Sequence, residues 1–380
     1  MSSPDATSPA QERYLVLGGS GFLGSYIVDA LVARGERHVF VYDLKSPASQ
    51  YQNASATYLT GDLCDSARLP EALQEVQPTV VFHTIAPVHG SPDKVQYKVN
   101  VDGTKAVLEA CRHPSLAGKI SKLVYTSSTG VVWKVRDMAG VTEDSVQPPA
   151  QGYDSYHHTK AIAERMVLEA DGRSLRTVVI RPCGMTGPRD QQLMHRLDTV
   201  LKQGQHKVQI GDNKNLVDWS YAGNVADAHL LAADCLPSPG SPDAATTPHP
   251  VAGQVFFITN GSPLPNWDFT RMVWRALGAR PEDLDPKNVT KIPRWLALAL
   301  AHVVEAVCRL LGTPTEFTVF AVQYSTATQW YNIDKARRVL GYEPKVSLQE
   351  AVNRAVQWWK DPGSAEWAAS QDRSKRKKRD

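Results

Sequence analysis

Cysteine is scarce in this chain, and the few cysteines lie far apart. The 5 residues are Cys64, Cys111, Cys183, Cys235 and Cys308, with no C-x-x-C pair. Zinc sites and disulfide frameworks bring cysteines together at short, recurring spacings. The start, MSSPDATSPAQER, also lacks the basic and then apolar order of a secretory leader. We therefore expect free thiols in a reducing compartment, and no metal site.

An excess of charge of one sign is missing as well. The formal net charge is +3, and the last ten residues carry six basic and two acidic groups, so the rest of the chain sums to −1. A protein that holds nucleic acid through its phosphates needs a basic face. The nearly neutral body of the chain therefore gives no reason to expect nucleic-acid binding.

Apolar runs long enough to span a membrane are also missing. The stretch PRWLALALAHVVEAVCRLLG, at 293–312, carries His302, Glu305 and Arg309 along one stripe of a helix. This pattern predicts an amphipathic helix, which lies either in a membrane interface or as a lid on the protein's own core. The basic end RSKRKKRD is either a further attraction to anionic lipid or a solvated tail.

Short apolar runs alternate with helical patterns along most of the chain. Six of these runs lie before Pro182 or end at it: YLVLGG, HVFVYDL, TYLTGDL, TVVFHTIAP, KLVYTSSTG and TVVIRP. A seventh, QVFFITNG, comes later in the chain. Strands separated by helices form a parallel sheet covered on both faces, with ligands at the carboxyl ends of its strands. The segments 187–214 and 265–344 are expected to be largely helical. The fold class is therefore α/β, a Rossmann-like doubly wound sheet with a smaller, mostly helical C-terminal subdomain.

Glycines follow the first strand in the stretch VLGGSGFLG. Gly18, Gly21 and Gly24 open a helix, and Asp43 ends the next strand. Glycine lets the backbone approach a pyrophosphate, the helix N-terminus attracts its charge, and a carboxylate accepts from ribose hydroxyls. A tight turn without a ligand is the alternative. Because a carboxylate repels a 2′-phosphate, Asp43 favours NAD over NADP, although Lys45 lies nearby.

These signals divide the chain into segments. We expect a disordered tail at 1–12, an NAD-binding Rossmann domain at 13–185, a substrate-binding subdomain at 186–362 with 223–260 returning to the Rossmann core, and a basic disordered tail at 363–380. Residues 236–253, rich in Pro, Ser and Gly, predict a surface loop. Asp62 follows the third strand, where it either meets the adenine amino group or forms a turn.

Tyr156 and Lys160 are four residues apart in YHHTK. On a helix they share one face, and most such pairs are ordinary surface residues. A phenol has an ordinary pKa of about 10, so it becomes a base near neutrality only when a cation stabilises its phenolate. Tyr153 has His157 rather than lysine four residues on. His157 and His158 diverge around the helix and cannot hold one metal ion together.

The order of these motifs carries more information than any one of them. This order resembles that of the extended short-chain dehydrogenase/reductase family: a glycine turn, an acidic strand end, TSS, YHHTK and RPCGMTGPRD. The resemblance extends from Arg13 to Trp359. Within it the chain is similar to the 3β-hydroxysteroid dehydrogenase group, above all to its decarboxylating members in fungal ergosterol synthesis. Residues 211–233 and 330–359 are similar to segments characteristic of those members.

The resemblance implies roles for particular residues. Tyr156 would take a proton from the substrate hydroxyl, and Lys160 would stabilise the phenolate and bind the nicotinamide ribose. Ser128 would bind the substrate oxygen, although the adjacent Ser127 could face the site instead. Trp133 and Met185 would line the substrate cleft. The expected cofactor contacts are Gly18, Gly21, Phe22, Leu23, Gly24, Asp43, Asp62, Leu63, Asn100, Tyr156, Lys160 and Pro182.

The implied reaction is NAD-dependent oxidation of the 3β-hydroxyl of a 4α-carboxysterol, with loss of the carboxylate as carbon dioxide. The same chemistry on a triterpenoid or steroidal secondary metabolite is an alternative. A nucleotide-sugar epimerase or dehydratase fits the apolar segment 293–312 poorly, and an NAD-binding redox-sensing regulator would not need the Ser-Tyr-Lys set. We expect peripheral association with the cytosolic side of the endoplasmic reticulum membrane, otherwise a cytoplasmic protein. The expected assembly is a homodimer or a sterol-demethylation complex.

Overall fold

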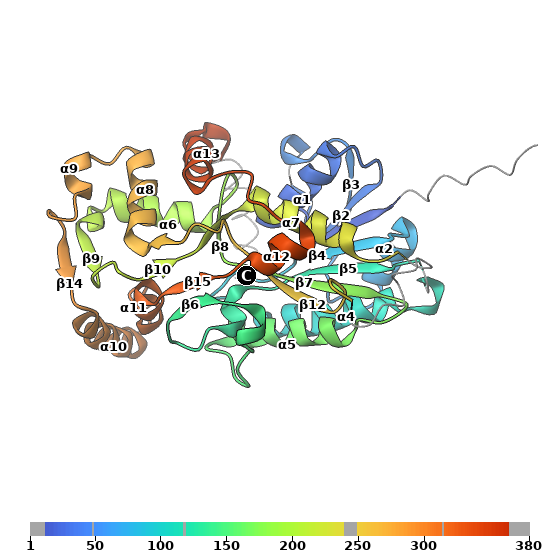
Figure 1. Cartoon of the computed structure of the whole chain (residues 1–380), viewed down its shortest axis with the longest axis horizontal. Helices are drawn as coiled ribbons and strands as arrows, with labels where there is room; N and C mark the ends of the chain where they lie inside the picture. Colours follow the sequence, from blue (N-terminus) through green and yellow to red (C-terminus); the bar gives the residue numbers. More distant parts are fainter. Residues whose placement is uncertain (1–11, 48, 117–118, 239–248, 314, 365–380) are drawn as a thin grey trace, which may run out of the picture. The chain divides into compact units, whose positions relative to one another are not determined.

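A computed structural model describes residues 12–47, 49–116, 119–238, 249–313 and 315–364 (Figure 1). The chain forms two compact units. The first holds the described residues up to Ser127, with Thr159–Ile180 and Ala226–Val255, and the second holds Ser128–His158, Arg181–Val225 and the described residues from Phe256 onward. Most of the loop expected at 236–253, and nearly all of both expected tails, lie outside the described residues.

A seven-stranded sheet has the strand order β12-β7-β5-β4-β1-β2-β3. Its strands are β1 (Tyr14–Leu17), β2 (Val39–Asp43), β3 (Ala56–Thr60), β4 (Val80–His83), β5 (Lys122–Thr126), β7 (Arg176–Pro182) and β12 (Gln254–Ile258). The pairs from β7 to β3 are all parallel. The reversal of strand order at β1 is the doubly wound arrangement. The fold class expected from the sequence is confirmed, with all seven strands at the predicted runs.

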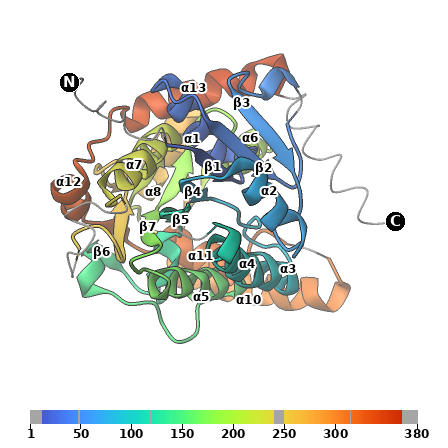
Figure 2. The same ribbon diagram turned by 90° about the vertical axis from the view of Figure 1, so that its right-hand side faces the viewer.

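Helices cover both faces of this sheet. Helices α1 (Phe22–Ala33) and α7 (Ala222–Cys235) lie on one face, and α4 (Gly103–Cys111) and α5 (Ser155–Glu169) lie on the other (Figure 2). Strands buried on both faces cannot alternate polar with apolar residues, and β1, β4 and β5 are accordingly buried at every position. Helix α2 (Arg68–Val76) adds Leu69, Leu73 and Val76 to the same core.

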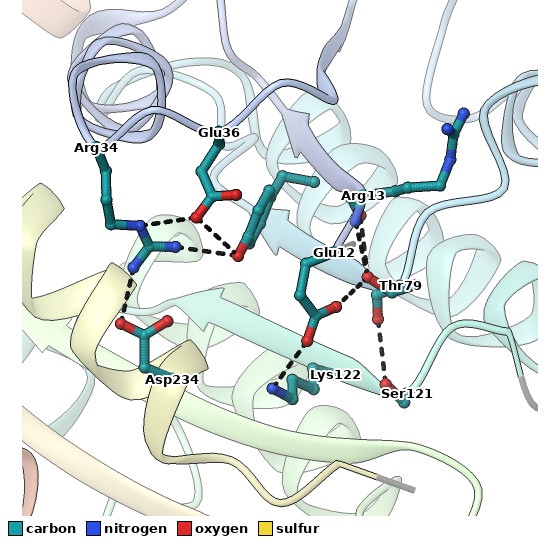
Figure 3. A network of polar contacts seen from close by, with 9 residues as sticks. Glu12, Arg13, Arg34, Glu36, Thr79, Ser121, Lys122 and Asp234 are labelled. Atoms are coloured by element: carbon teal, nitrogen blue, oxygen red, sulfur yellow. Dashed lines mark hydrogen bonds and ion pairs between the residues drawn. The ribbon is translucent and has the colours of Figure 1, made fainter. Parts of the chain in front are cut away.

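A polar network joins the amino ends of the strands (Figure 3). Lys122 Nζ, at the start of β5, lies 3.2 Å from the Glu12 carboxylate, and Glu12 also accepts from the Thr79 hydroxyl. Arg34 Nη1 meets the Asp234 carboxylate at 2.7 Å and so joins the ends of α1 and α7. Glu12, assigned above to the tail, therefore belongs to the ordered unit. These contacts support the end of the sheet opposite the carboxyl ends of its strands.

The second unit combines short strands with helices. Its sheets are β13-β10-β15-β6, β11-β8 and β14-β9. The strands are β6 (Met138–Val141), β8 (Gly184–Thr186), β9 (Val208–Ile210), β10 (Leu216–Val217), β11 (Trp219–Tyr221), β13 (Leu264–Pro265), β14 (Thr290–Ile292) and β15 (Gln329–Tyr331). The helices are α6 (Gln192–Lys202), α8 (Asn266–Leu277), α9 (Pro281–Leu284), α10 (Arg294–Leu311), α11 (Val319–Thr326), α12 (Asp334–Leu340) and α13 (Leu348–Lys360). Strands this short have no detectable sequence period, and the mainly helical prediction missed them.

The remaining helix, α3 (Asp93–Tyr97), leads through a π-helical turn, Lys98–Asp102, into α4. Met194, Phe269, Trp274 and Val352, from α6, α8 and α13, form a core of the second unit. No helix in the described part of the chain is both long and apolar enough to cross a membrane.

Candidate active site

The glycine turn after β1 is held by its own backbone. Gly18, at φ +86°, donates to the Tyr42 carbonyl at 2.9 Å, and Gly21 donates to the Gly18 carbonyl at 3.0 Å. A Cβ at position 24 would lie 2.1 Å from the Gly18 oxygen, so no larger residue fits there without moving the turn. Gly21 caps α1 without a side chain, which keeps the first amides of the helix uncovered. The turn is thus shaped for an anionic group at the start of α1.

Asp43, the last residue of β2, lies beside the glycine turn and is hydrogen-bonded to it. Its Oδ2 accepts from the Ser20 amide at 3.1 Å and its Oδ1 from the Leu44 amide at 2.7 Å. Burial raises the pKa of the Asp43 carboxyl, and these amides oppose the rise. Lys45 is exposed. A half-buried carboxylate beside the glycine turn is placed as a ribose acceptor would be.

The other expected adenosine contacts lie around the same strand ends. Asp62 is exposed, and its Oδ1 accepts from the Cys64 amide at 2.9 Å, which is the hydrogen bond of a turn. Leu63 and Leu23 are buried, and Phe22 is half-buried. The carboxylate of Asp62 therefore stabilises a turn, and its contact with adenine stays a prediction.

Asn100 lies in the π-helical turn before α4 and is 1% exposed. Its Nδ2 donates to Gln96 at 3.1 Å and to Thr159 at 2.9 Å, whereas its buried Oδ1 has no hydrogen-bond partner among the described residues. A buried amide oxygen without a partner costs free energy, so a polar group from outside the chain is expected to complete it. This oxygen and the glycine turn fit a bound dinucleotide.

Lys160 is buried, with 2% of its surface exposed. Its Nζ donates to the Thr126 carbonyl at 2.5 Å and lies 4.3 Å from the centroid of the Tyr125 ring. Burial lowers the pKa of Lys160 to about 7, and the charge of Glu164 opposes the shift. Glu164, one helical turn further on, accepts from the Ser127 hydroxyl at 2.6 Å. The sequence analysis missed Glu164, although its i, i+4 spacing from Lys160 was a visible signal.

The lowered pKa of Lys160 gives a pH dependence of stability. The unfolded chain keeps the proton up to pH 10.5 and the folded protein only up to about 7, so the unfolded state binds more protons between these values. Folding stability therefore rises with pH in this window. Relative to Lys160→Met, the wild-type free energy of unfolding should increase by up to about 1.4 kcal/mol per pH unit, measured by urea unfolding from pH 7 to 10. Parallel curves for the two proteins would mean that the folded protein keeps this lysine charged.

Tyr156 and Ser128 meet in the second unit. Tyr156, in the first turn of α5, is half-buried, and its hydroxyl is hydrogen-bonded to the Ser128 side chain. Burial raises the pKa of Tyr156, and the Ser128 hydrogen bond opposes the rise. Ser128 Oγ also accepts from the Gly130 amide at 3.1 Å. Of the two serines in TSS, Ser127 thus binds Glu164, and Ser128 lies at the phenol.

The residues suggested for substrate contact differ in exposure. Trp133 is 1% exposed, and its ring lies 5.3 Å from that of Tyr153 and 5.8 Å from that of Phe320, within an aromatic cluster. Met185, in β8, is half-buried, and Pro182 is buried at the end of β7. The rings of the aromatic cluster leave Trp133 almost no exposed surface, and its contact with substrate stays a prediction.

The neighbouring histidines have separate partners. His157 Nδ1 lies 2.7 Å from the Asp154 carboxylate, and His158 Nδ1 accepts from the Gly152 amide at 3.3 Å. The Tyr153 hydroxyl donates to Gln323 at 3.1 Å. These contacts agree with packing roles for all three side chains.

The described groups can support alcohol oxidation. A phenol with a hydroxyl partner can bind and deprotonate an alcohol, and α5 carries a lysine one turn from that phenol. The glycine turn, Asp43 and Asn100 can hold a dinucleotide.

Known proteins resemble this chain over almost its full length. It is 40% identical to the decarboxylating sterol-4-alpha-carboxylate 3-dehydrogenase of Schizosaccharomyces pombe, over 90% of this chain and 95% of that protein. The human enzyme of the same name is 35% identical, over 91% and 88%. The crystal structure of gox2253 covers 93% of this chain and 99% of its own, with a TM-score of 0.71 at 22% identity.

A UDP-glucose 4-epimerase from Thermus thermophilus, solved with NAD, has a TM-score of 0.66 at 24% identity and covers 92% of this chain and 99% of its own. These two structures establish the shared fold. Residues 15–289 match the 3-beta hydroxysteroid dehydrogenase/isomerase family. With this match and a relative at 40% identity, the chain belongs to the 3-beta hydroxysteroid dehydrogenase/isomerase family.

Proposed function

We propose that this protein oxidises the 3β-hydroxyl of a sterol 4α-carboxylate with NAD⁺ and releases the carboxylate as carbon dioxide. The observation that carries the proposal is the hydrogen bond between Ser128 and Tyr156 at the start of the helix that also bears Lys160. The names of the S. pombe and human relatives supply the substrate class.

In this proposal each residue acts on a particular atom. Tyr156 accepts the proton of the C3 hydroxyl, and Ser128 holds the same oxygen by a hydrogen bond. Lys160 in its charged form favours the phenolate of Tyr156, which burial otherwise disfavours. Bound NAD⁺ supplies the acceptor for the hydride that leaves C3. Because Asp43 would repel a 2′-phosphate, NAD is the favoured dinucleotide.

Loss of carbon dioxide follows from the first oxidation. A ketone at C3 makes the acid a β-keto acid, so the C4–carboxyl bond can break with its electron pair entering the enolate. The enolate then takes a proton at C4 and becomes the 3-ketone. The described residues therefore need to provide only the oxidation and a site that holds the acid in place.

The test is turnover of a defined substrate. Purified protein given NAD⁺ and a 4α-carboxy-3β-hydroxysterol should form NADH, measured by absorbance, and a 3-ketone that lacks the carboxylate, identified by mass. Oxidation of a triterpenoid acid but not of the sterol acid would keep the chemistry and change the substrate. NAD binding without turnover of any hydroxylated lipid would overturn the enzyme proposal and favour a redox-sensing regulator.

We also propose that α10 lies at a membrane surface, where a sterol acid would reside, and that this surface is the cytosolic face of the endoplasmic reticulum. Seven of its large apolar side chains are exposed: Trp295, Leu296, Leu300, Val303, Val307, Leu310 and Leu311. The helix packs on α11 through the small residues Ala297 and Ala301, together with Val322. A helix that buries alanines and exposes tryptophan and leucine is suited to an interface rather than to a closed lid.

Replacing exposed apolar residues of α10 should weaken membrane binding. Each of Trp295, Val303 and Leu310 is more than 60% exposed. Changing all three to serine should lower partitioning onto liposomes at least roughly tenfold, because each buried apolar side chain contributes on the order of 1 kcal/mol or more. Flotation with vesicles measures the change. Val95→Ser with Val208→Ser, at exposed sites outside α10, is the matched control. Equal flotation of all three proteins would count against this surface.

A further inference from the structure

Helix α11 presents two aromatic residues one turn apart, Phe320 and Tyr324. Their rings stack at 5.4 Å between centroids, and the Tyr324 ring lies 5.7 Å from that of Trp133. Residues on another side of α11, Val319 and Val322, pack towards α10. Tyr324 is therefore held by rings of the second unit on a helix whose other side is occupied.

The Tyr324 side chain remains accessible despite these contacts. It is 41% exposed, and among the described residues its hydroxyl has no hydrogen-bond partner. By contrast, the Tyr153 hydroxyl in the same aromatic cluster donates to Gln323 at 3.1 Å. An accessible phenol that is packed among aromatic rings is available to a ligand.

Tyr324 is connected to the proposed catalytic phenol through neighbouring rings. The Trp133 ring, which contacts Tyr324, lies 6.3 Å from the His157 ring, and the His157 ring lies 5.3 Å from that of Tyr156. Burial raises the pKa of Tyr324 to about 12, and the neighbouring charges that add to the rise are those of Cys183 and Tyr156. The neighbouring rings of Trp133 and Phe320 cover part of the phenol and keep water from that part. Its hydroxyl keeps its proton at neutral pH and can act only as a hydrogen-bond donor or neutral acceptor.

We propose that the Tyr324 hydroxyl donates a hydrogen bond to the carboxylate of the substrate and so selects acids over neutral 3β-hydroxysterols. The inference rests on the proposed function. In the proposed substrate the carboxylate and the hydroxyl are on adjacent carbons. A donor near Tyr156 can therefore bind the carboxylate while Tyr156 binds the hydroxyl. No bond to Tyr324 is made or broken, and its proton stays in place.

A neutral donor also suits the fate of this carboxylate. The Tyr324 hydroxyl is uncharged at neutral pH, because burial raises its pKa. A cation bound to the carboxylate would hold the negative charge that must move to the ketone oxygen as carbon dioxide leaves. A hydrogen bond from a phenol also recognises the acid, but it opposes the loss of carbon dioxide less than a cation would. The reason is that only interactions that are stronger in the transition state than in the bound substrate favour the reaction.

The test compares two substrates in two variants. Tyr324→Phe removes one oxygen from a partly exposed side chain, so folding should persist, and the thermal unfolding midpoint and NAD affinity check this. For the 4α-carboxy-3β-hydroxysterol, kcat/KM should fall roughly 10- to 100-fold, the range for a hydrogen bond to a charged group. For the matching 3β-hydroxysterol without the carboxylate, kcat/KM should stay unchanged. Tyr153→Phe, which removes a hydroxyl bound to α11, is the matched control and should keep the wild-type preference.

Each outcome bears on one of the two proposals. An equal fall for both substrates in Tyr324→Phe, or no fall for either, would overturn the role of Tyr324 while wild-type turnover of the acid upholds the proposed function. If Tyr153→Phe loses the acid preference as well, the effect comes from the position of α11, and the direct contact is wrong. If the wild-type protein oxidises no acid, the proposed function fails, and the role of Tyr324 fails with it.

Discussion

Tyr156→Phe is expected to lower kcat for alcohol oxidation by roughly a thousandfold or more, while NAD affinity stays near that of the wild type. A positioned acid–base group contributes about 10²- to 10⁴-fold to rate, and phenylalanine keeps the ring but loses the proton acceptor. Ser128, which is bonded to this hydroxyl, cannot replace it, since an aliphatic hydroxyl is a far weaker acid than a phenol. Stopped-flow measurement of NADH formation under saturating substrate isolates the chemical step.

Tyr153→Phe is the control for this experiment. Tyr153 lies three residues earlier, and its hydroxyl is bound to Gln323. The control should retain most of the wild-type rate, which would show that loss of a nearby phenol is not in itself harmful. Turnover by Tyr156→Phe within tenfold of the wild-type rate would refute the assignment of the base.

Gly24→Ala is expected to damage both folding and cofactor binding. The added methyl carbon would lie 2.1 Å from the Gly18 oxygen and 2.8 Å from the Gly19 Cα, both of which are backbone atoms of the turn. We expect a loss of about 1–3 kcal/mol in the free energy of unfolding, as for other overpacked sites. NAD affinity should fall at least roughly tenfold, or about 1.4 kcal/mol, because the turn that we propose to face the pyrophosphate must move. Urea unfolding and calorimetric titration with NAD measure the two effects.

Gly172→Ala offers a matched glycine in the same unit. A Cβ there would meet its nearest neighbour, the Ala170 carbonyl oxygen, at 4.0 Å, and its φ is not in the left-handed region. This control should leave NAD affinity unchanged. Wild-type affinity in Gly24→Ala would show that the turn accommodates a side chain and that its glycines are not required for the cofactor.

Local signals were enough for much of the fold. Strands β1, β4 and β5 are buried on both faces, so each appears as a nearly continuous apolar run, and each is followed by a turn or helix signal of its own. The glycine turn and Asp43 could be located because a nucleotide site on this fold depends on residues at strand ends, whose order along the chain is fixed. The short strands of the second unit, such as β10 and β15, escaped prediction because two or three residues cannot show a period.

The residues of the candidate site also fall into those that the sequence predicts and those that only the structure identifies. Spacing on one helix put Tyr156 and Lys160 within a turn of each other, and no tertiary information was needed for that. The choice between Ser127 and Ser128 did need it, because adjacent residues after a strand point in different directions, and only packing shows that one binds Glu164 and the other lies at Tyr156. Tyr324 follows Tyr156 by 168 residues along the chain, and no sequence pattern relates the two.

Chemistry that depends on helical or strand periodicity could thus be read from the amino-acid order, since neighbouring residues alone set those geometries. The fold class, the glycine turn, Asp43 and the Tyr156–Lys160 pair are of this kind. The burial that lowers the pKa of Lys160, the unsatisfied oxygen of Asn100 and the meeting of α11 with the aromatic cluster depend on distant segments coming together. Desolvation and long-range contact exist only once the chain has folded, and for that reason these features were decided in three dimensions.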